Sequence, residues 1–231
     1  MHFSPLGDLA VTITLGTAID EPTHRLVRAV TRAIMASDIA GVTDIVPAFA
    51  SVTVHYDPLR IRRTGNESPY EQLVSALREQ LDGVRVEDLP EPRLVEIPVC
   101  YGGTLGPDLT DLAQQHNLST NEVVRLHSGA VYLVYMVGFM PGFAYLGGLP
   151  ERIATPRRAS PRTAVPAGSV GIGGQQTGVY PLESPGGWNL IGRTPLQIFD
   201  ITRDEQTLLA TGDRVRFVPI TLRQFQRWPA T

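Results

Sequence analysis

The sequence predicts an α+β domain over residues 1–90, with the ferredoxin-like order βαββαβ, followed by a mainly-β barrel over residues 91–231. Glycine and proline are unevenly distributed: residues 1–92 contain 5 of the 22 glycines, whereas residues 138–195 contain 12 glycines and 8 prolines. Between these regions lies Leu89-Pro90-Glu91-Pro92, in which neither a helix nor a paired strand continues easily. The dense turn residues favour a closed barrel in the second region over a doubly wound sheet.

Hydrophobic periodicity predicts the elements of the first domain. Residues 9–15 alternate between apolar and small or polar side chains, as in a half-buried strand. Two helices each carry apolar residues on one face, the first capped by Asp20 or Thr23 and the second by Ser68. In chain order we expect a strand at 9–15, a helix through 26–34, strands at 42–46 and 52–56, a helix at 68–81 and a strand at 84–86.

The second domain begins with a strand over residues 94–99 and continues with two short helices. Ser119 and Glu122 match a capping box, in which each side chain satisfies a backbone donor of the other residue. A buried strand follows at 131–137, and short strands separated by Gly/Pro turns continue to about Phe217. A terminal helix is expected from Thr221 to Trp228.

Composition excludes several kinds of chemistry. All 20 basic residues are arginine, so the chain lacks the amine that a Schiff base, a biotinylated lysine or a P-loop requires. The net charge is −3 without any block of like charge, so no nucleic-acid partner is expected. No segment matches a signal peptide or a membrane span, which predicts a soluble, cytoplasmic protein without a membrane partner.

The single cysteine, Cys100, cannot form an internal disulfide or a thiolate metal cluster. Because it follows a strand-like run, a buried structural thiol is favoured over a nucleophile. Histidines and carboxylates nowhere show the spacing of metal ligands, so no metal site is expected.

Four Gly/Pro-rich segments, residues 138–148, 165–170, 173–181 and 184–195, form the candidate binding surface. Glycine lets the backbone approach a ligand closely, although the tight turns of a barrel need the same residues. Guanidinium groups suit carboxylate and phosphate, and aromatic side chains can form pocket walls or fill a small barrel. The candidates for substrate or anion binding are Arg157, Tyr180, Trp188, Arg193, Gly173 and Gly174, and the catalytic candidates are His127, Arg162 and Gln176.

His127 has two interpretations, because it lies at the end of a helix and just before a buried strand. It is either a general acid/base near neutral pH or a structural partner of the helix C-terminus, and the structural role is slightly favoured. For the arginines, the alternative to a binding role is a solvated surface position.

Ordered motifs run through the second domain. They are Tyr101-Gly102-Gly103, Gly106-Pro107-Asp108, Leu126-His127-Ser128, Gly138-Phe139, Pro141-Gly142-Phe143, Pro161-Arg162, Val165-Pro166-Ala167-Gly168-Ser169-Val170, Gln176-Thr177-Gly178, Tyr180-Pro181, Ser184-Pro185-Gly186-Gly187-Trp188 and Ile191-Gly192-Arg193-Thr194-Pro195. In this pattern the chain resembles a family of proteins with a carboxyltransferase-type domain. The family comprises the B-type subunit of 5-oxoprolinase, the first subunit of allophanate hydrolase and the sporulation-kinase inhibitor KipI. Gln175 departs from the family, which often has a small residue before Gln-Thr-Gly.

The resemblance implies that the barrel is cyclophilin-like and that the chain is a subunit of an ATP-dependent 5-oxoprolinase, which opens 5-oxo-L-proline to L-glutamate. It further implies ATP with magnesium in the complex, partner subunits of the A and C types, and a small lactam or amide substrate. Two alternatives remain: a subunit of a urea/allophanate pathway hydrolase, and a non-catalytic inhibitor of the KipI kind.

Two structural expectations follow. The side chains of Arg157, Arg162, Gln176, Tyr180 and Arg193 are predicted to converge on one face of the barrel, with His127 nearby. Without lysine, a P-loop or a nucleophile elbow, the isolated chain is expected to be inactive. Some of the aromatic and apolar side chains then form a docking surface for a partner, unless they point into the core: Phe139, Met140, Phe143, Tyr145 and Trp188.

Overall fold

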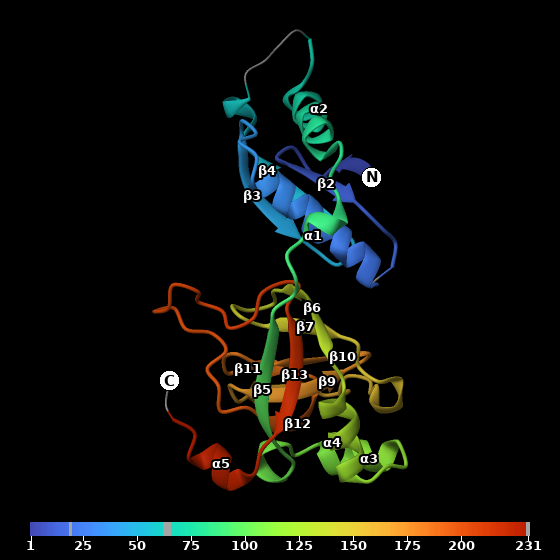
Figure 1. Ribbon diagram of the computed structural model, residues 1–231, viewed down its shortest axis with the longest axis vertical. Coiled ribbons are helices and arrows are strands. Elements are labelled where there is room, and N and C mark those ends of the chain that lie inside the picture. Colours follow the sequence, from blue (N-terminus) through green and yellow to red (C-terminus); the bar gives the residue numbers. More distant parts are fainter. Residues whose placement is uncertain (19, 62–65, 230–231) are drawn as a thin grey trace. The chain divides into compact units, whose positions relative to one another are not determined.

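The computed structural model describes residues 1–18, 20–61 and 66–229 (Figure 1). The chain divides into two compact units, residues 1–91 and 92–231. No helix in the described part of the chain combines the length and hydrophobicity that a membrane crossing requires.

The first unit is an antiparallel sheet with strand order β1-β2-β4-β3, combined with two helices (Figure 1). Alternate residues of β2 and β4 point into a core shared with the apolar faces of the helices. Asp20 caps the first helix by accepting from the Thr23 backbone N–H, and Ser68 and Glu71 form a capping box on the second. The elements are β1 (His2–Pro5), β2 (Ala10–Thr14), α1 (Glu21–Met35), β3 (Val42–Pro47), β4 (Ser51–Tyr56), η1 (Pro58–Arg60), α2 (Pro69–Leu81) and η2 (Val86–Asp88).

The predicted order βαββαβ is not reproduced, because the observed order of strands and helices is ββαββα. The expected strand at 84–86 is wrong: Val86–Asp88 forms a single 3₁₀ turn, and the short apolar run lies between acidic residues and Gly83, which disfavour a strand. The edge next to β2 is occupied by β1, which pairs with β2 in the register His2↔Thr14 to Pro5↔Val11. Sequence patterns missed β1 because it is four residues long and ends in proline.

The second unit contains a closed barrel with strand order β10-β7-β6-β13-β5-β12-β9, which confirms the mainly-β barrel. β9 and β10 pair and close it, and β5 and β13 are its parallel pair. Its strands are β5 (Leu94–Tyr101), β6 (Tyr132–Val137), β7 (Ala144–Gly147), β9 (Ser169–Gly173), β10 (Gln176–Val179), β12 (Asn189–Arg193) and β13 (Arg214–Pro219).

Smaller elements complete the second unit around the barrel. A two-stranded sheet of β8 and β11 packs beside an aromatic cluster that is separate from the barrel core. That cluster consists of Phe143, Val165, Tyr180, Trp188 and Leu190. The remaining elements are η3 (Gly103–Leu105), α3 (Leu109–Gln115), α4 (Thr120–Gly129), η4 (Glu151–Ile153), β8 (Arg162–Val165), β11 (Ser184–Gly186) and α5 (Leu222–Gln226).

Candidate functional site

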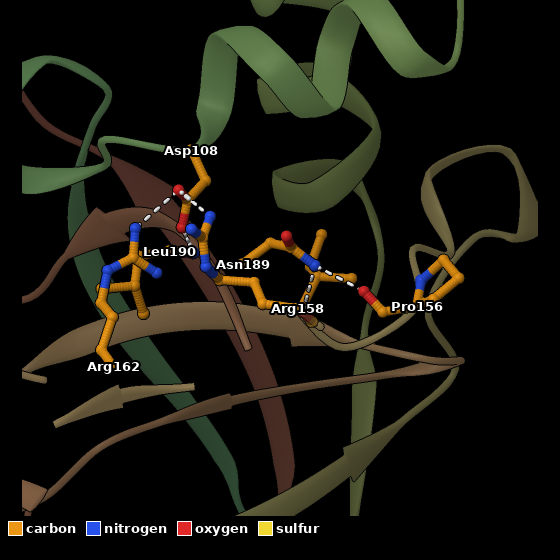
Figure 2. Close-up of polar contacts among 7 residues, drawn as sticks. Asp108, Pro156, Arg158, Arg162, Asn189 and Leu190 are labelled. Carbon is orange, nitrogen blue, oxygen red and sulfur yellow. Dashed lines mark hydrogen bonds and ion pairs between the residues drawn. The ribbon is translucent and has the colours of Figure 1, made fainter. Parts of the chain in front are cut away.

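A buried carboxylate joins three segments of the barrel unit (Figure 2). Asp108 Oδ1 accepts from Arg158 Nη1 at 3.0 Å and from Arg162 Nη2 at 2.7 Å. Asp108 Oδ2 accepts from the Leu190 backbone N–H at 2.7 Å, and the Asp108 N–H donates to the Leu190 carbonyl at 2.9 Å. Both carboxylate oxygens are therefore used within the protein, and β8, β12 and the start of α3 are held together.

This cluster carries a net positive charge, because one carboxylate serves two guanidinium groups. The Arg162 side chain is 26% exposed and that of Arg158 is 37% exposed, whereas the Asp108 side chain is only 7% exposed. Arg162 Nη1 is buried and has no hydrogen-bond partner among the described residues. The excess positive charge of the cluster suits the recognition of an anion.

Next to the cluster lies a pocket of about 250 Å³ with aromatic walls, which we call the aromatic pocket. The Arg158 backbone N–H donates to the Gly187 carbonyl at 2.7 Å, which ties the cluster to the pocket rim. Arg157 is the charged residue of the lining, and no carboxylate lines the pocket. The lining residues are Phe139, Phe143, Tyr145, Arg157, Pro161, Tyr180, Pro185, Gly186, Gly187 and Trp188.

Edge-to-face contacts make the aromatic wall rigid. The ring of Phe143 lies 4.9 Å from that of Tyr145, 5.4 Å from that of Tyr180 and 5.5 Å from that of Trp188, at steep interplanar angles. A Cβ at Gly186 would come within 2.5 Å of the Tyr180 hydroxyl, so only glycine lets β11 approach this ring. The wall is therefore preformed and does not need a ligand to assemble it.

The Tyr180 hydroxyl lies within electrostatic reach of two arginines. Burial raises the pKa of Tyr180, while the backbone amide of Trp188 and the charges of Arg157 and Arg162 act in the opposite direction. Because the net effect is upward, the hydroxyl stays protonated at neutral pH and can donate a hydrogen bond. Three of the predicted residues, Arg157, Arg162 and Tyr180, are thus brought together.

Arg193 lines a different pocket. Its Nε donates to the Ala167 carbonyl at 2.7 Å, and it borders a cavity of about 380 Å³ together with Thr194 and Trp228. Arg193 and Arg157, which we predicted to lie on one face of the barrel, therefore line two different pockets.

The metal-ligating side chains that the structure describes in the barrel do not form a site for magnesium. Within the described ranges, no group of three or more histidine, cysteine, aspartate or glutamate side chains could hold a metal ion. Both oxygens of Asp108 already accept hydrogen bonds from the protein. Arginine and aromatic side chains bind anions and flat rings instead, so the aromatic pocket suits an organic anion.

Comparisons with known proteins decide the family. A family model described as "Carboxyltransferase domain, subdomain C and D" matches residues 1–209. The B-type subunit of 5-oxoprolinase from Bacillus subtilis is 44% identical over 226 residues, which cover 96% of this chain and 94% of the relative. The protein of the same name from Escherichia coli O157:H7 is 44% identical over 214 residues, which cover 93% and 94%. The chain belongs to the family of 5-oxoprolinase B-type subunits.

A solved structure, TTHA0988, agrees with this fold at a TM-score of 0.78 and 36% identity. The match covers 91% of this chain but only 40% of TTHA0988. The present family member therefore spans less than half the length of that solved chain.

In this family member, His127 lies inside the barrel core, which favours its structural interpretation. Its Nδ1 is 2.8 Å from the Tyr101 hydroxyl and its Nε2 is 2.9 Å from Thr177 Oγ1, which itself donates to the Gly171 carbonyl. The ring stacks on Phe217 at 4.5 Å and is fully buried. Burial lowers the pKa of His127 from 6.5 to about 3, so the ring is neutral at physiological pH. Because the side chain is fully buried, it cannot exchange a proton directly with a ligand at the surface.

The other predicted glycine and glutamine positions serve the β9–β10 hairpin. A Cβ at Gly173 would come within 2.5 Å of the Trp188 indole, so Gly173 gives room to the aromatic wall. Gly174 has φ +65° in the turn and exchanges backbone hydrogen bonds with Thr155. Gln176 pairs with Gly173 at the start of β10, and it does not line the aromatic pocket.

Sequence analysis missed the role of Asp108. Aspartate before a helix is ordinarily explained as an N-cap, and Asp108 does occupy that position of α3. Its side chain makes no capping hydrogen bond and turns instead to Arg158 and Arg162. The local pattern of a cap gives no sign of partners 50 and 54 residues further along the chain.

Proposed function

We propose that the chain is the B-type subunit of an ATP-dependent 5-oxoprolinase, which opens 5-oxo-L-proline to L-glutamate together with A- and C-type partner subunits in the cytoplasm. The observation that carries the proposal is the match to curated proteins of that name over nearly the whole of both chains. The proposal includes a cyclophilin-like class for the barrel.

The aromatic pocket supports the proposal chemically. 5-Oxo-L-proline has a flat, neutral lactam ring and a carboxylate that is ionised at neutral pH. The ring fits against Trp188 and Tyr145, and the carboxylate fits the guanidinium of Arg157 at the rim. Arg157, Arg158 and Arg162 carry three positive charges against one negative charge from Asp108, and this excess stabilises negative charge on a bound substrate.

ATP and magnesium belong to a partner subunit on this proposal, because the described part of the barrel offers no ligand set for the ion. The chain also has no lysine for a P-loop. Phe139 supports a docking role, since its side chain is 64% exposed at the rim of the aromatic pocket and its backbone has φ +71°. Such an exposed aromatic residue in an unfavourable conformation is typical of a functional contact.

Reconstitution with the partner subunits tests the function. We expect ATP-dependent release of glutamate from 5-oxo-L-proline by the full complex and none by the chain alone. Arg157→Gln should lower kcat/KM roughly 10- to 150-fold, the range for a hydrogen bond to a charged group. Arg152→Gln, which removes an exposed arginine of η4 outside the pocket, is the matched control and should leave the rate unchanged.

Two results would overturn the proposal. One is full turnover by a complex that lacks this chain, and the other is turnover by the isolated chain at the rate of the complex. The urea-pathway and kinase-inhibitor alternatives predict no glutamate release in any combination, so the same assay separates them from the proposed activity.

A further inference from the structure

The cavity beside Arg193 is separate from the aromatic pocket and plays no part in the proposed chemistry. It measures about 380 Å³, a size that accepts a small organic molecule. We call it the Arg193 pocket. Its lining is Ala167, Gly168, Pro181, Arg193, Thr194, Pro195, Leu196, Gln197, Phe225, Trp228 and Pro229.

Arg193 is fixed in place but retains its strongest donors. Its Nε donates to the Ala167 carbonyl at 2.7 Å, which orients the guanidinium plane. Its two terminal Nη groups have no hydrogen-bond or ion-pair partner in the part of the chain that the structure describes. A planar group with two parallel free N–H donors matches the two oxygens of a carboxylate.

The rest of the lining is rigid and uncharged. Pro181 and Pro195 form fixed walls, and the rings of Phe225 and Trp228 from the α5 region add a flat apolar side. Gly168 has φ +81°, and a Cβ there would come within 2.5 Å of the Thr194 carbonyl, so the backbone at this end cannot carry a side chain. Close backbone packing and two proline rings therefore define the shape of this end of the cavity.

Charge narrows the ligand class. Among the described residues, no aspartate or glutamate lines the cavity, so these residues offer no counter-charge for an ammonium group. One arginine neutralises one carboxylate, whereas a doubly charged phosphate would require further cationic or amide donors. A zwitterionic amino acid would leave its ammonium group without a charged partner beside this apolar wall.

We propose that the Arg193 pocket is a second binding site, specific for a small monocarboxylate whose nitrogen is acylated and therefore uncharged. Its carboxylate pairs with Arg193, and its apolar or amide part lies against Trp228. The site stands independently of the proposed function, which guides only the choice of 5-oxo-L-proline as the first probe.

The two tryptophans make the test direct, because one lies in each pocket. The full chain labelled with 5-fluorotryptophan gives one ¹⁹F NMR signal from Trp188 and one from Trp228, and Trp228→Phe assigns them. Three probes share a five-membered ring: 5-oxo-L-proline, L-proline, which adds the ammonium group, and 2-pyrrolidinone, which lacks the carboxylate. Each is titrated into the wild-type chain and into Arg193→Gln.

We expect 5-oxo-L-proline to shift the Trp228 signal saturably and the other two probes to bind at least roughly 10-fold more weakly. Arg193→Gln should weaken binding at Trp228 roughly 10- to 150-fold. Before any ligand is added, the Trp188 signal of this variant should have its wild-type position, which shows that the barrel remains folded. Arg157→Gln should leave the Trp228 titration unchanged. The proposal is overturned if L-proline binds as well as 5-oxo-L-proline, if Arg193→Gln binds normally, or if only the Trp188 signal responds. A complex without 5-oxoprolinase activity whose Trp228 signal still titrates would contradict the proposed function alone.

Discussion

Substitution of Asp108 by asparagine tests whether the buried carboxylate organises the barrel surface. Asparagine has nearly the same shape but no charge, and its side-chain NH₂ is a donor. Every partner of the Asp108 carboxylate is also a donor: Arg158, Arg162 and the Leu190 N–H. In either orientation of the amide, its NH₂ therefore faces another donor, and two guanidinium groups lose their shared counter-charge.

The expected loss of stability follows from the exposure of each partner. Arg162 is 26% exposed, and a hydrogen bond to a charged group of this kind contributes about 1.5–3 kcal/mol. Arg158 is 37% exposed, and solvent screening reduces its ion pair to about 0–1 kcal/mol. Asp108→Asn should thus lower the free energy of unfolding of the barrel unit by about 1.5–4 kcal/mol. Arg158→Gln, the matched control, should cost no more than about 1 kcal/mol.

Urea unfolding followed by tryptophan fluorescence measures this loss in the relevant unit. Both tryptophans, Trp188 and Trp228, belong to the barrel unit, so the signal does not report on residues 1–91. The reasoning is refuted if Asp108→Asn changes the free energy of unfolding by less than about 0.5 kcal/mol, or if Arg158→Gln destabilises the barrel equally.

Three further predictions concern the core, the aromatic wall and the rim. Since burial lowers the pKa of His127 to about 3, the unfolded chain takes up a proton below pH 6.5 and the folded chain does not. Stability should therefore fall by about 2 kcal/mol between pH 6.5 and pH 5, and His127→Gln should flatten this slope in urea titrations at each pH. Gly173→Ala should lower the unfolding free energy by about 1–3 kcal/mol in the same urea assay, because its Cβ meets the Trp188 indole. Gly129→Ala, where a Cβ meets nothing within 4 Å, should be nearly neutral, and equal losses would contradict the packing argument. Phe139→Gly should leave the melting temperature of the isolated chain unchanged or raise it, because φ +71° suits glycine. It should also weaken co-elution with the partner subunits in size-exclusion chromatography, and undiminished assembly would exclude Phe139 from the interface.

Local patterns in the sequence were sufficient to predict most helices and strands. They were insufficient to predict which segment forms the edge strand beside β2 in the first unit. Long periodic segments such as α1 and α2 bury one face and have side-chain caps, so pattern and structure agree. The short strand β1 and the 3₁₀ turn at Val86–Asp88 depend on which edge of the sheet is available. Pairing between strands that are distant in sequence decides which edge is used. The four residues of β1 and the three residues of Val86–Asp88 are too few to show a periodic pattern.

The candidate site was predictable as a set of segments but not as a set of contacts. The density of glycine, proline and arginine pointed to the region in which Arg157, Tyr180 and Trp188 line a pocket. The burial of His127 was not evident from its position, because Tyr101 and Thr177 supply its hydrogen bonds from distant strands. Polar residues in a core become identifiable only when their partners are known.

The division of the arginines between two pockets has a geometric cause. Trp188 and Arg193 are five residues apart around β12, yet Trp188 lines the aromatic pocket and Arg193 lines the other one. Trp188 directly precedes β12, whereas Arg193 is the last residue of that strand. The pairing of β12 with β9 also shifts register between Leu190 and Gly192, and a Cβ at Gly192 would come within 2.6 Å of Val99. The register shift accompanies the close packing of β12 against β5, and a motif that is continuous in sequence contributes to the walls of two separate pockets.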